Sequence, residues 1–210
     1  MHFKIKVCGI TRPKYALTAV SLGADMVGMI FHRRSPRWVP QAMAKKTREV
    51  LPATVRAVGV FVEQDVEQIA RTAERLKLDF VQLHGQYTIG DVRRLQSLGL
   101  KVIRVHHIGS AADYKAVYCD RADLVLLDNR SETAVGGTGQ RFDWGLKPPR
   151  LIPNLVLAGG ISADNVEEGV RQFRPLVVDV NSGVEKSPGI KSPAKLRRFF
   201  EVCNGLRYGR

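Results

Sequence analysis

Eight short apolar runs rich in β-branched residues recur along the chain, and segments with helical periodicity separate most of them. This alternation is typical of repeated βα units around a parallel sheet. Eight units without a break favour an α/β fold of the closed (βα)8 TIM-barrel type over an open doubly wound sheet, whose GxGxxG fingerprint is absent after the first run. The predicted strands span residues 4–7, 26–31, 57–62, 80–83, 102–105, 124–127, 155–158 and 176–180.

Start and stop signals bound the predicted helices. Glycine closes the first and the fourth, at Gly23 and Gly99,. The segment DWGLKPPRLIP after the sixth strand leaves room for only about one helical turn before its prolines,. No linker or shift in composition divides the chain, so we expect one barrel domain over residues 1–210,. The predicted helix N-caps are Thr11, Asp65, Ser162 and Ser192,.

The three cysteines, Cys8, Cys119 and Cys203, lie far apart and have no CxxC partner. This spacing excludes the usual structural zinc and redox motifs and predicts free thiols in a reducing compartment. The sequence shows neither a cleavable leader nor an apolar run of membrane-spanning length, so we expect a soluble cytoplasmic protein without membrane association. The pattern leaves open whether it is a monomer or a homodimer.

The formal net charge is +13 at pH 7. Such a charge suits nucleic acid, an anionic membrane surface or an anionic small substrate. The basic residues are scattered, apart from the clusters HRRSPR and KLRRFF, and no basic array interleaved with aromatic residues occurs,. We therefore expect a solvated basic surface rather than a nucleic-acid-binding one.

Reactive side chains end four of the predicted strands: Cys8, His84, Asp128 and Asp179. In a barrel, function sits at the carboxyl ends of the strands. Because side chains alternate along a strand, Cys8 shares its side with Lys6, and both would face the interior. A buried ammonium needs a carboxylate partner, and Asp128 and Asp179 are both candidates.

Structural explanations compete with functional ones at these positions. Cys8 alone is as readily a small apolar filler, because free cysteine is among the most buried residue types. Asp128 ends the apolar run LVLL, and the long glycine-rich loop after it favours a functional role,. Arg37 stands between Pro36 and Trp38 in a basic loop, which predicts a guanidinium held in a fixed direction for a substrate carboxylate,.

Two small-residue turns, LAGGI and VNSGVE, end the last two predicted strands. Barrels often bind phosphate there through backbone N–H groups, because glycine lets the backbone approach an anion closely. His106 and His107 alternate to opposite faces and no HExxH-like spacing occurs, so we expect no metal site,. The predicted phosphate site comprises Gly159, Gly160, Ser182 and Gly183.

The chain carries, in this order, KVCGIT, GADMVGMIF, SPRWV, GVFV, VQLHG, LLD, GGTGQRFDW, LAGGI, and VDVNSGVE followed by PGIK. This series, which extends over residues 6–191, resembles phosphoribosylanthranilate isomerase, a family of tryptophan biosynthesis. The resemblance implies a barrel enzyme without cofactor or metal. Its reaction would be the Amadori rearrangement of N-(5'-phosphoribosyl)anthranilate, a small phosphorylated molecule, to 1-(2-carboxyphenylamino)-1-deoxyribulose 5-phosphate.

The resemblance also implies the site residues. Cys8 would be the general base that removes the C2' proton, and Asp128 the general acid that protonates the furanose oxygen. Arg37 would hold the anthranilate end, with His84 and Asp179 lining the site. The backbone of the two glycine turns would hold the phosphate.

These roles require a thiolate and a protonated carboxyl, the less common ionisation state of each group. A free thiol titrates near about 8.5 and an aspartate near about 3.9. We expect Lys6 to lower the pKa of Cys8, and burial beside Asp179 to raise that of Asp128.

Two other functions stay open at this stage. One is the related aminoaldose isomerase of histidine biosynthesis, or a bifunctional enzyme that accepts both substrates; that class presents an aspartate where this chain has Cys8. The other is a non-catalytic barrel that binds RNA, which the net charge alone suggests.

Overall fold

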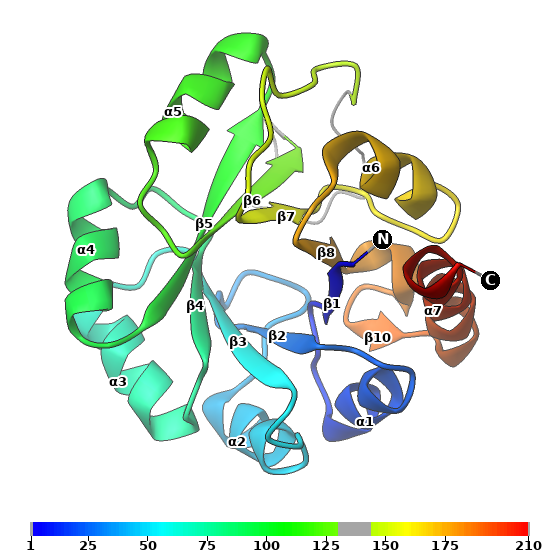
Figure 1. Ribbon diagram of the computed structural model, residues 1–210. Helices are drawn as coiled ribbons and strands as arrows, with labels where there is room; N and C mark the ends of the chain where they lie inside the picture. The colour runs from blue at the N-terminus through cyan, green and yellow to red at the C-terminus, as the bar shows by residue number, and fades with distance from the viewer. Residues whose placement is uncertain (1, 130–143, 210) are drawn as a thin grey trace.

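Eight parallel strands close into a barrel in the sequence order β1 to β8. We describe residues 2–129 and 144–209 of a computed structural model. Figure 1 shows the barrel with the helices around it. The strands are β1 (Lys4–Val7), β2 (Met26–Ile30), β3 (Arg56–Phe61), β4 (Phe80–Leu83), β5 (Lys101–Ile108), β6 (Leu124–Asn129), β7 (Leu155–Leu157) and β8 (Val177–Val180). The predicted fold and all eight predicted strands are confirmed.

Seven α-helices occupy the described part of the chain outside the barrel. Residues 144–154, before β7, contain none, in agreement with the expected lack of room there. No helix of the described residues is long and apolar enough to cross a bilayer. The helices are α1 (Pro13–Ser21), α2 (Gln41–Glu49), α3 (Val66–Leu76), α4 (Ile89–Ser97), α5 (Tyr114–Cys119), α6 (Val166–Phe173) and α7 (Pro193–Tyr208), with a 3-10 turn, η1 (Ala111–Asp113), before α5.

Four of the predicted helix signals are confirmed. Asp65 caps α3 and Ser192 caps α7, each side chain accepting a backbone N–H of the first turn. Gly23 and Gly99 follow α1 and α4 with φ values of 103° and 79°, the left-handed conformation that glycine adopts without steric cost,.

Two predicted caps are wrong. Arg12 occupies the N-cap position of α1, and the Thr11 hydroxyl instead donates to the carbonyl of Gly189, 2.6 Å away. Helix α6 begins three residues later than a Ser162 cap would place it, with Asn165 at its N-cap. The Thr11 hydroxyl bonds to another loop, and the Ser162 hydroxyl accepts the backbone N–H of Asp164 within a tight turn. Neither group therefore caps a helix.

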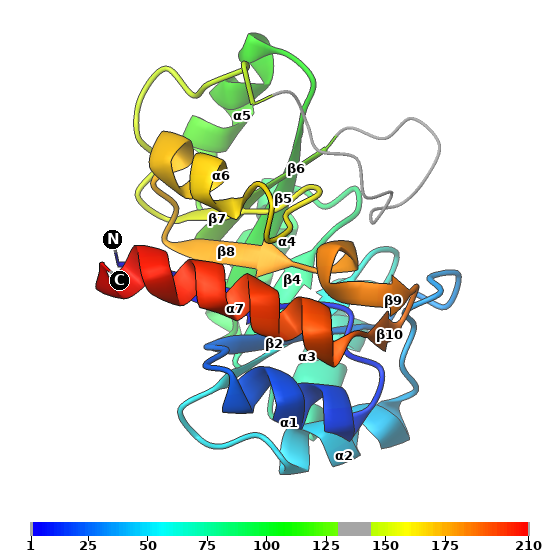
Figure 2. The same ribbon diagram turned by 90° about the vertical axis from the view of Figure 1, so that its right-hand side faces the viewer.

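A two-stranded hairpin that the sequence did not predict follows β8. It consists of a 3-10 turn, η2 (Ser182–Val184), then β9 (Glu185–Ser187) and β10 (Ile190–Lys191). Figure 2 shows it beyond the carboxyl end of β8. Thr11 and the backbone of Pro36 both pack against Gly189 at its tip. The hairpin therefore ties the last strand to the loops after β1 and β2.

The barrel interior is apolar in its lower part and polar toward the carboxyl ends of the strands. Its apolar part is filled by alternate residues of the strands, which are buried because every strand of a closed parallel barrel is covered on both faces. These buried residues are Met26, Val58, Ile103, Leu124, Leu126, Val156, Ala158 and Val177. A larger apolar cluster fills the space between the strands and the helices.

Three aspartates fix the register of neighbouring strands at the opposite end of the barrel. Each directly precedes an even-numbered strand, and its carboxylate accepts a backbone N–H from the odd-numbered strand before it. The bonds run from Ile5, Ala57 and Val102 to Asp25, Asp79 and Asp123, at 2.8, 2.8 and 2.9 Å.

We expect Asp79→Ala to lower the free energy of unfolding by about 1–2 kcal/mol, because the N–H of the buried Ala57 loses its acceptor,. Arg56→Ala is the matched control: it removes only the exposed ion pair to the same carboxylate and should cost less than about 1 kcal/mol,. Urea unfolding at unchanged m-value measures both. Equal losses in the two variants would contradict this role for Asp79.

Candidate active site

The carboxyl end of the barrel buries five charged residues within the described part of the chain. These are three cations and two carboxylates: Lys6, Arg37, Lys191, Asp179 and Glu185. Burying a charge is costly unless the charge is paired. Their concentration at this end, which we call the mouth, marks it as a built site.

Lys6 and Asp179 form one buried pair. The register between β1 and β8 sets the two residues side by side, so both side chains face the interior, and Lys6 Nζ donates to Asp179 Oδ2 at 2.7 Å. Burial alone would lower the pKa of Lys6, but the charges of Asp179 and Cys8 raise it above its ordinary value. Of the two candidate partners for Lys6, the structure thus selects Asp179.

Cys8 lies at the mouth, 4% exposed, next to the Lys6 ammonium. Gly28 on β2 faces it, and a Cβ at that position would lie 2.7 Å from Cys8 Sγ, so the site has no room for a larger residue there. Burial raises the pKa of the Cys8 thiol above its ordinary value; Lys6 and Lys191 oppose this and Asp179 adds to it. Lys6 therefore acts in the expected direction, but its effect is smaller than that of burial.

Asp128 reaches the mouth from β6. The register between β5 and β6 places it beside His107, and its Oδ2 lies 3.9 Å from Nε2 of His84. Its side chain is 15% exposed, and it interacts electrostatically with Asp179. Burial, followed by the charge of His107, lowers the pKa of His84 to about 4, so His84 is neutral at physiological pH.

Arg37 is held by Glu185 of the hairpin. Its Nη2 donates to Glu185 Oε2 at 2.8 Å, and its Nε lies 3.1 Å from both carboxylate oxygens. Although burial opposes the effect, Arg37 and Lys191 hold the pKa of Glu185 below its ordinary range. The guanidinium is thus held in one direction by an ion pair that the sequence pattern did not predict.

Lys191 completes the mouth on the hairpin side. Its Nζ donates at 2.9 Å to Glu185 Oε1, to Asn181 Oδ1 and to the carbonyl of Asn181. Asn181 Oδ1 in turn lies against Gly9, where a Cβ would come within 2.4 Å of it. The Lys191 ammonium therefore approaches the backbone immediately after Cys8.

The two glycine turns meet each other. Gly159 and Gly160 have φ values of 77° and 73°. A Cβ at Gly183 would lie 2.1 Å from the carbonyl oxygen of Ile161, so the backbone of η2 packs directly on the turn after β7. This close approach, which only glycine permits, brings the predicted phosphate residues of both strands to one place.

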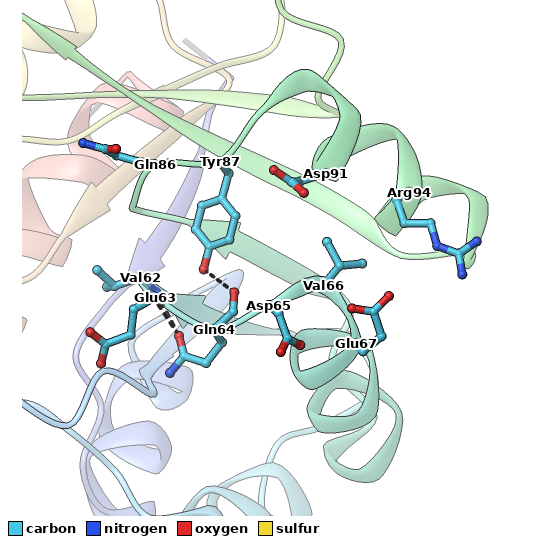
Figure 3. A pocket seen from close by; sticks show the side chains of 10 residues that line it. All are labelled: Val62, Glu63, Gln64, Asp65, Val66, Glu67, Gln86, Tyr87, Asp91 and Arg94. Carbon is cyan, nitrogen blue, oxygen red and sulfur yellow. Dashed lines mark hydrogen bonds between the residues drawn. The ribbon is translucent and has the colours of Figure 1, made fainter.

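A hollow of about 470 Å³ lies outside the mouth, between the starts of α3 and α4. Figure 3 shows it, with the Tyr87 hydroxyl donating to the carbonyl of Gln64 at 3.0 Å. Acidic side chains, among them Glu63 and Asp91, line it together with Arg94. None of the predicted site residues is among its lining residues, so it is not the predicted active site.

Sequence reasoning missed Glu185, Lys191 and the inward-facing His107. The first two stand in VNSGVEKSPGIK, a polar stretch with no periodicity that signals burial. His106 and His107 do point to opposite faces: His106 Nε2 lies 2.7 Å from Asp120 outside the barrel, and the His107 ring contacts that of His84. No group of three potential metal ligands occurs in residues 2–129 and 144–209.

The chain is similar to known proteins over nearly its whole length. A family model described as N-(5'-phosphoribosyl)anthranilate isomerase matches residues 5–202. A protein of Citrifermentans bemidjiense with that name is 43% identical over 202 residues, which cover 94% of this chain and 95% of the relative. One from Trichlorobacter lovleyi is 40% identical, with 94% and 96% covered.

Solved structures show the same similarity. The phosphoribosyl anthranilate isomerase of Thermus thermophilus aligns with a TM-score of 0.88 at 32% identity, covering 98% of this chain and all of that one. A second isomerase was crystallised with reduced 1-(o-carboxyphenylamino)-1-deoxyribulose 5-phosphate. It aligns with a TM-score of 0.85 at 34% identity, covering 97% of this chain and all of the other.

Proposed function

The chain belongs to the N-(5'-phosphoribosyl)anthranilate isomerase family, and we propose that Cys8 and Asp128 divide the acid and base work of its reaction. It is an enzyme of tryptophan biosynthesis that performs the family's isomerisation. The observation that carries the assignment is that both side chains project into one mouth, from β1 and β6, with buried cations beside the thiol.

The proposed reaction begins at Asp128. Its carboxyl proton goes to the furanose oxygen, the C1'–O bond breaks, and the nitrogen lone pair forms an iminium with C1'. Cys8 then removes the C2' proton, and the electron pair of that C–H bond forms a C1'–C2' double bond as the iminium is neutralised. The resulting enol amine tautomerises to the ketone. Electrons move only within the substrate, so the rearrangement balances without an external oxidant or reductant.

The rest of the mouth suits the two ends of the substrate. We propose that the Arg37 guanidinium, which Glu185 holds in place, directs its remaining N–H groups at the anthranilate carboxylate,. The phosphate would lie on the backbone of Gly159, Gly160, Ser182 and Gly183. Neutral His84 and the Lys6-paired Asp179 would line the sugar between these ends.

The three cysteines support a reducing compartment for the reaction. All three are free thiols: Cys8 and Cys203 are buried and Cys119 is exposed. We propose the cytoplasm, because disulfides are rare and free thiols persist there.

The purified protein should consume freshly prepared N-(5'-phosphoribosyl)anthranilate, followed by its fluorescence. In the same assay Arg37→Lys should raise KM by about tenfold to a hundredfold with a smaller change in kcat, because lysine loses the bidentate geometry toward a carboxylate. An inactive wild-type protein would refute the assignment. An unchanged KM in Arg37→Lys would refute only the role of Arg37.

A further inference from the structure

The buried charges at the mouth do not balance. Lys6 faces Asp179 in a one-to-one pair at 2.7 Å. Glu185, the other buried carboxylate, is shared between Arg37 at 2.8 Å and Lys191 at 2.9 Å. Three cations and two carboxylates thus leave one positive charge in excess within the buried group, in a place where water does not screen it,.

Of the two cations that share Glu185, Lys191 makes fewer contacts to the carboxylate. Arg37 makes three of the contacts to Glu185, and Lys191 makes one. Its other two hydrogen bonds go to neutral oxygens of Asn181, which satisfy its donors without cancelling its charge. The side chain is fully buried, so its charge acts through low-dielectric surroundings, where it is screened less than in solvent,.

Lys191 places its charge near Cys8. Asn181 Oδ1, one hydrogen bond from the ammonium, packs against Gly9, the residue after Cys8. Cys8 and Lys191 act on one another electrostatically, each favouring the charged form of the other. Further charged or titratable groups at the mouth are Lys6 on β1, His32 and Arg37 after β2, His84 after β4, His107 on β5, Asp128 on β6, Asp179 on β8 and Glu185 on β9.

We propose that Lys191 is a positioning residue for the isomerisation, whose uncompensated ammonium stabilises a negative charge on Cys8. The inference rests on the proposed role of Cys8 as base and adds a second buried cation, besides Lys6, that favours its thiolate form. Glu185 sets how strongly Lys191 acts on Cys8. It pairs with Arg37 and at the same time compensates part of the Lys191 charge. Lys6 acts on the thiol more strongly than Lys191 does, but Asp179, which is paired with Lys6, opposes that effect.

A titration without substrate tests the proposal. The ultraviolet absorbance of the thiolate is followed against pH for each protein minus its Cys8→Ser counterpart, which removes the signals of Cys119, Cys203 and the tyrosines. Lys191→Met should move the midpoint to higher pH by at least about one unit, a tenfold smaller thiolate fraction at a given pH. Lys191→Arg should keep the midpoint near that of the wild type.

A second variant gives the opposite sign. Glu185→Gln should move the midpoint to lower pH, because it releases the Lys191 charge, while KM for the substrate rises as Arg37 loosens. General damage to the fold does not produce shifts in opposite directions. Lys186→Met, which removes an exposed cation from the same hairpin, is the matched control and should leave the midpoint unchanged.

The outcomes separate the two proposals. An unchanged midpoint in both Lys191→Met and Glu185→Gln would overturn the role of Lys191 and assign the excess charge to the substrate carboxylate. If Lys191→Met does not fold, the direction of the shift in Glu185→Gln decides alone. A fully active Cys8→Ser protein would refute Cys8 as the base, whatever the titration shows.

Discussion

Asp128→Asn should reduce kcat by on the order of 10³-fold while KM changes little. Asparagine keeps the shape of the side chain and its position beside His107 at the end of β6. It removes the proton that the furanose oxygen must receive before the ring can open. An amide does not supply that proton, and His84, whose Nε2 lies 3.9 Å from the Asp128 carboxylate, is neutral at physiological pH.

The assay for this prediction follows consumption of fresh substrate in single turnovers and at steady state, so that binding and chemistry are separated. His107→Gln is the matched control, because it changes the strand neighbour of Asp128 without removing a proposed acid. We expect it to lose far less rate than Asp128→Asn. Full activity in Asp128→Asn would exclude this carboxyl as the general acid.

The acid and the base are linked by one proton. A thiol with a carboxylate and a thiolate with a carboxylic acid carry the same net charge. The ratio of these two states therefore does not depend on pH. Burial favours the thiol form of Cys8. The productive form is therefore a minority whose population is set by the surrounding charges, which explains why five buried charged residues gather around two reacting groups.

The fold was accessible from the sequence because its signals are local and repeated. Each apolar run is buried on both faces, so its composition alone identifies a strand, and eight such runs define the barrel. The errors occur where a distant contact decides. Thr11 reads as a helix cap, yet its hydroxyl bonds Gly189, which is far away in the chain and adjacent in space.

The candidate site was predictable to the extent that strand alternation determines it. Alternation places Lys6 and Cys8 on the inner face, and closure of the barrel between β1 and β8 then brings Asp179 to Lys6. Alternation says nothing about the hairpin after β8, since its strands pair only with each other. Glu185 and Lys191 reach the site only because the hairpin folds over the loops after β1 and β2, which strand alternation does not predict.

Cys8→Ser should lower kcat by on the order of 10³-fold, with substrate binding largely retained. Serine fits the space beside Gly28, where a larger side chain does not. Its hydroxyl titrates far above any thiol, so the neighbouring cations do not provide an oxyanion in its place. Cys119→Ser, which changes an exposed thiol, should leave the rate unchanged.

The pH profile of kcat/KM distinguishes the loss of the base from misfolding, because misfolding lowers the rate at every pH without moving a titration. The productive form carries a thiolate and a carboxylic acid, so its share does not change with pH between the two pKa values of the pair. In the wild type, kcat/KM should therefore be level between these two values and fall above the higher one, where both protons are lost; because burial raises the pKa of Cys8, this fall lies at alkaline pH,. In Cys8→Ser the fall should move, because the thiol no longer titrates. An unchanged profile in Cys8→Ser would show that another group removes the C2' proton.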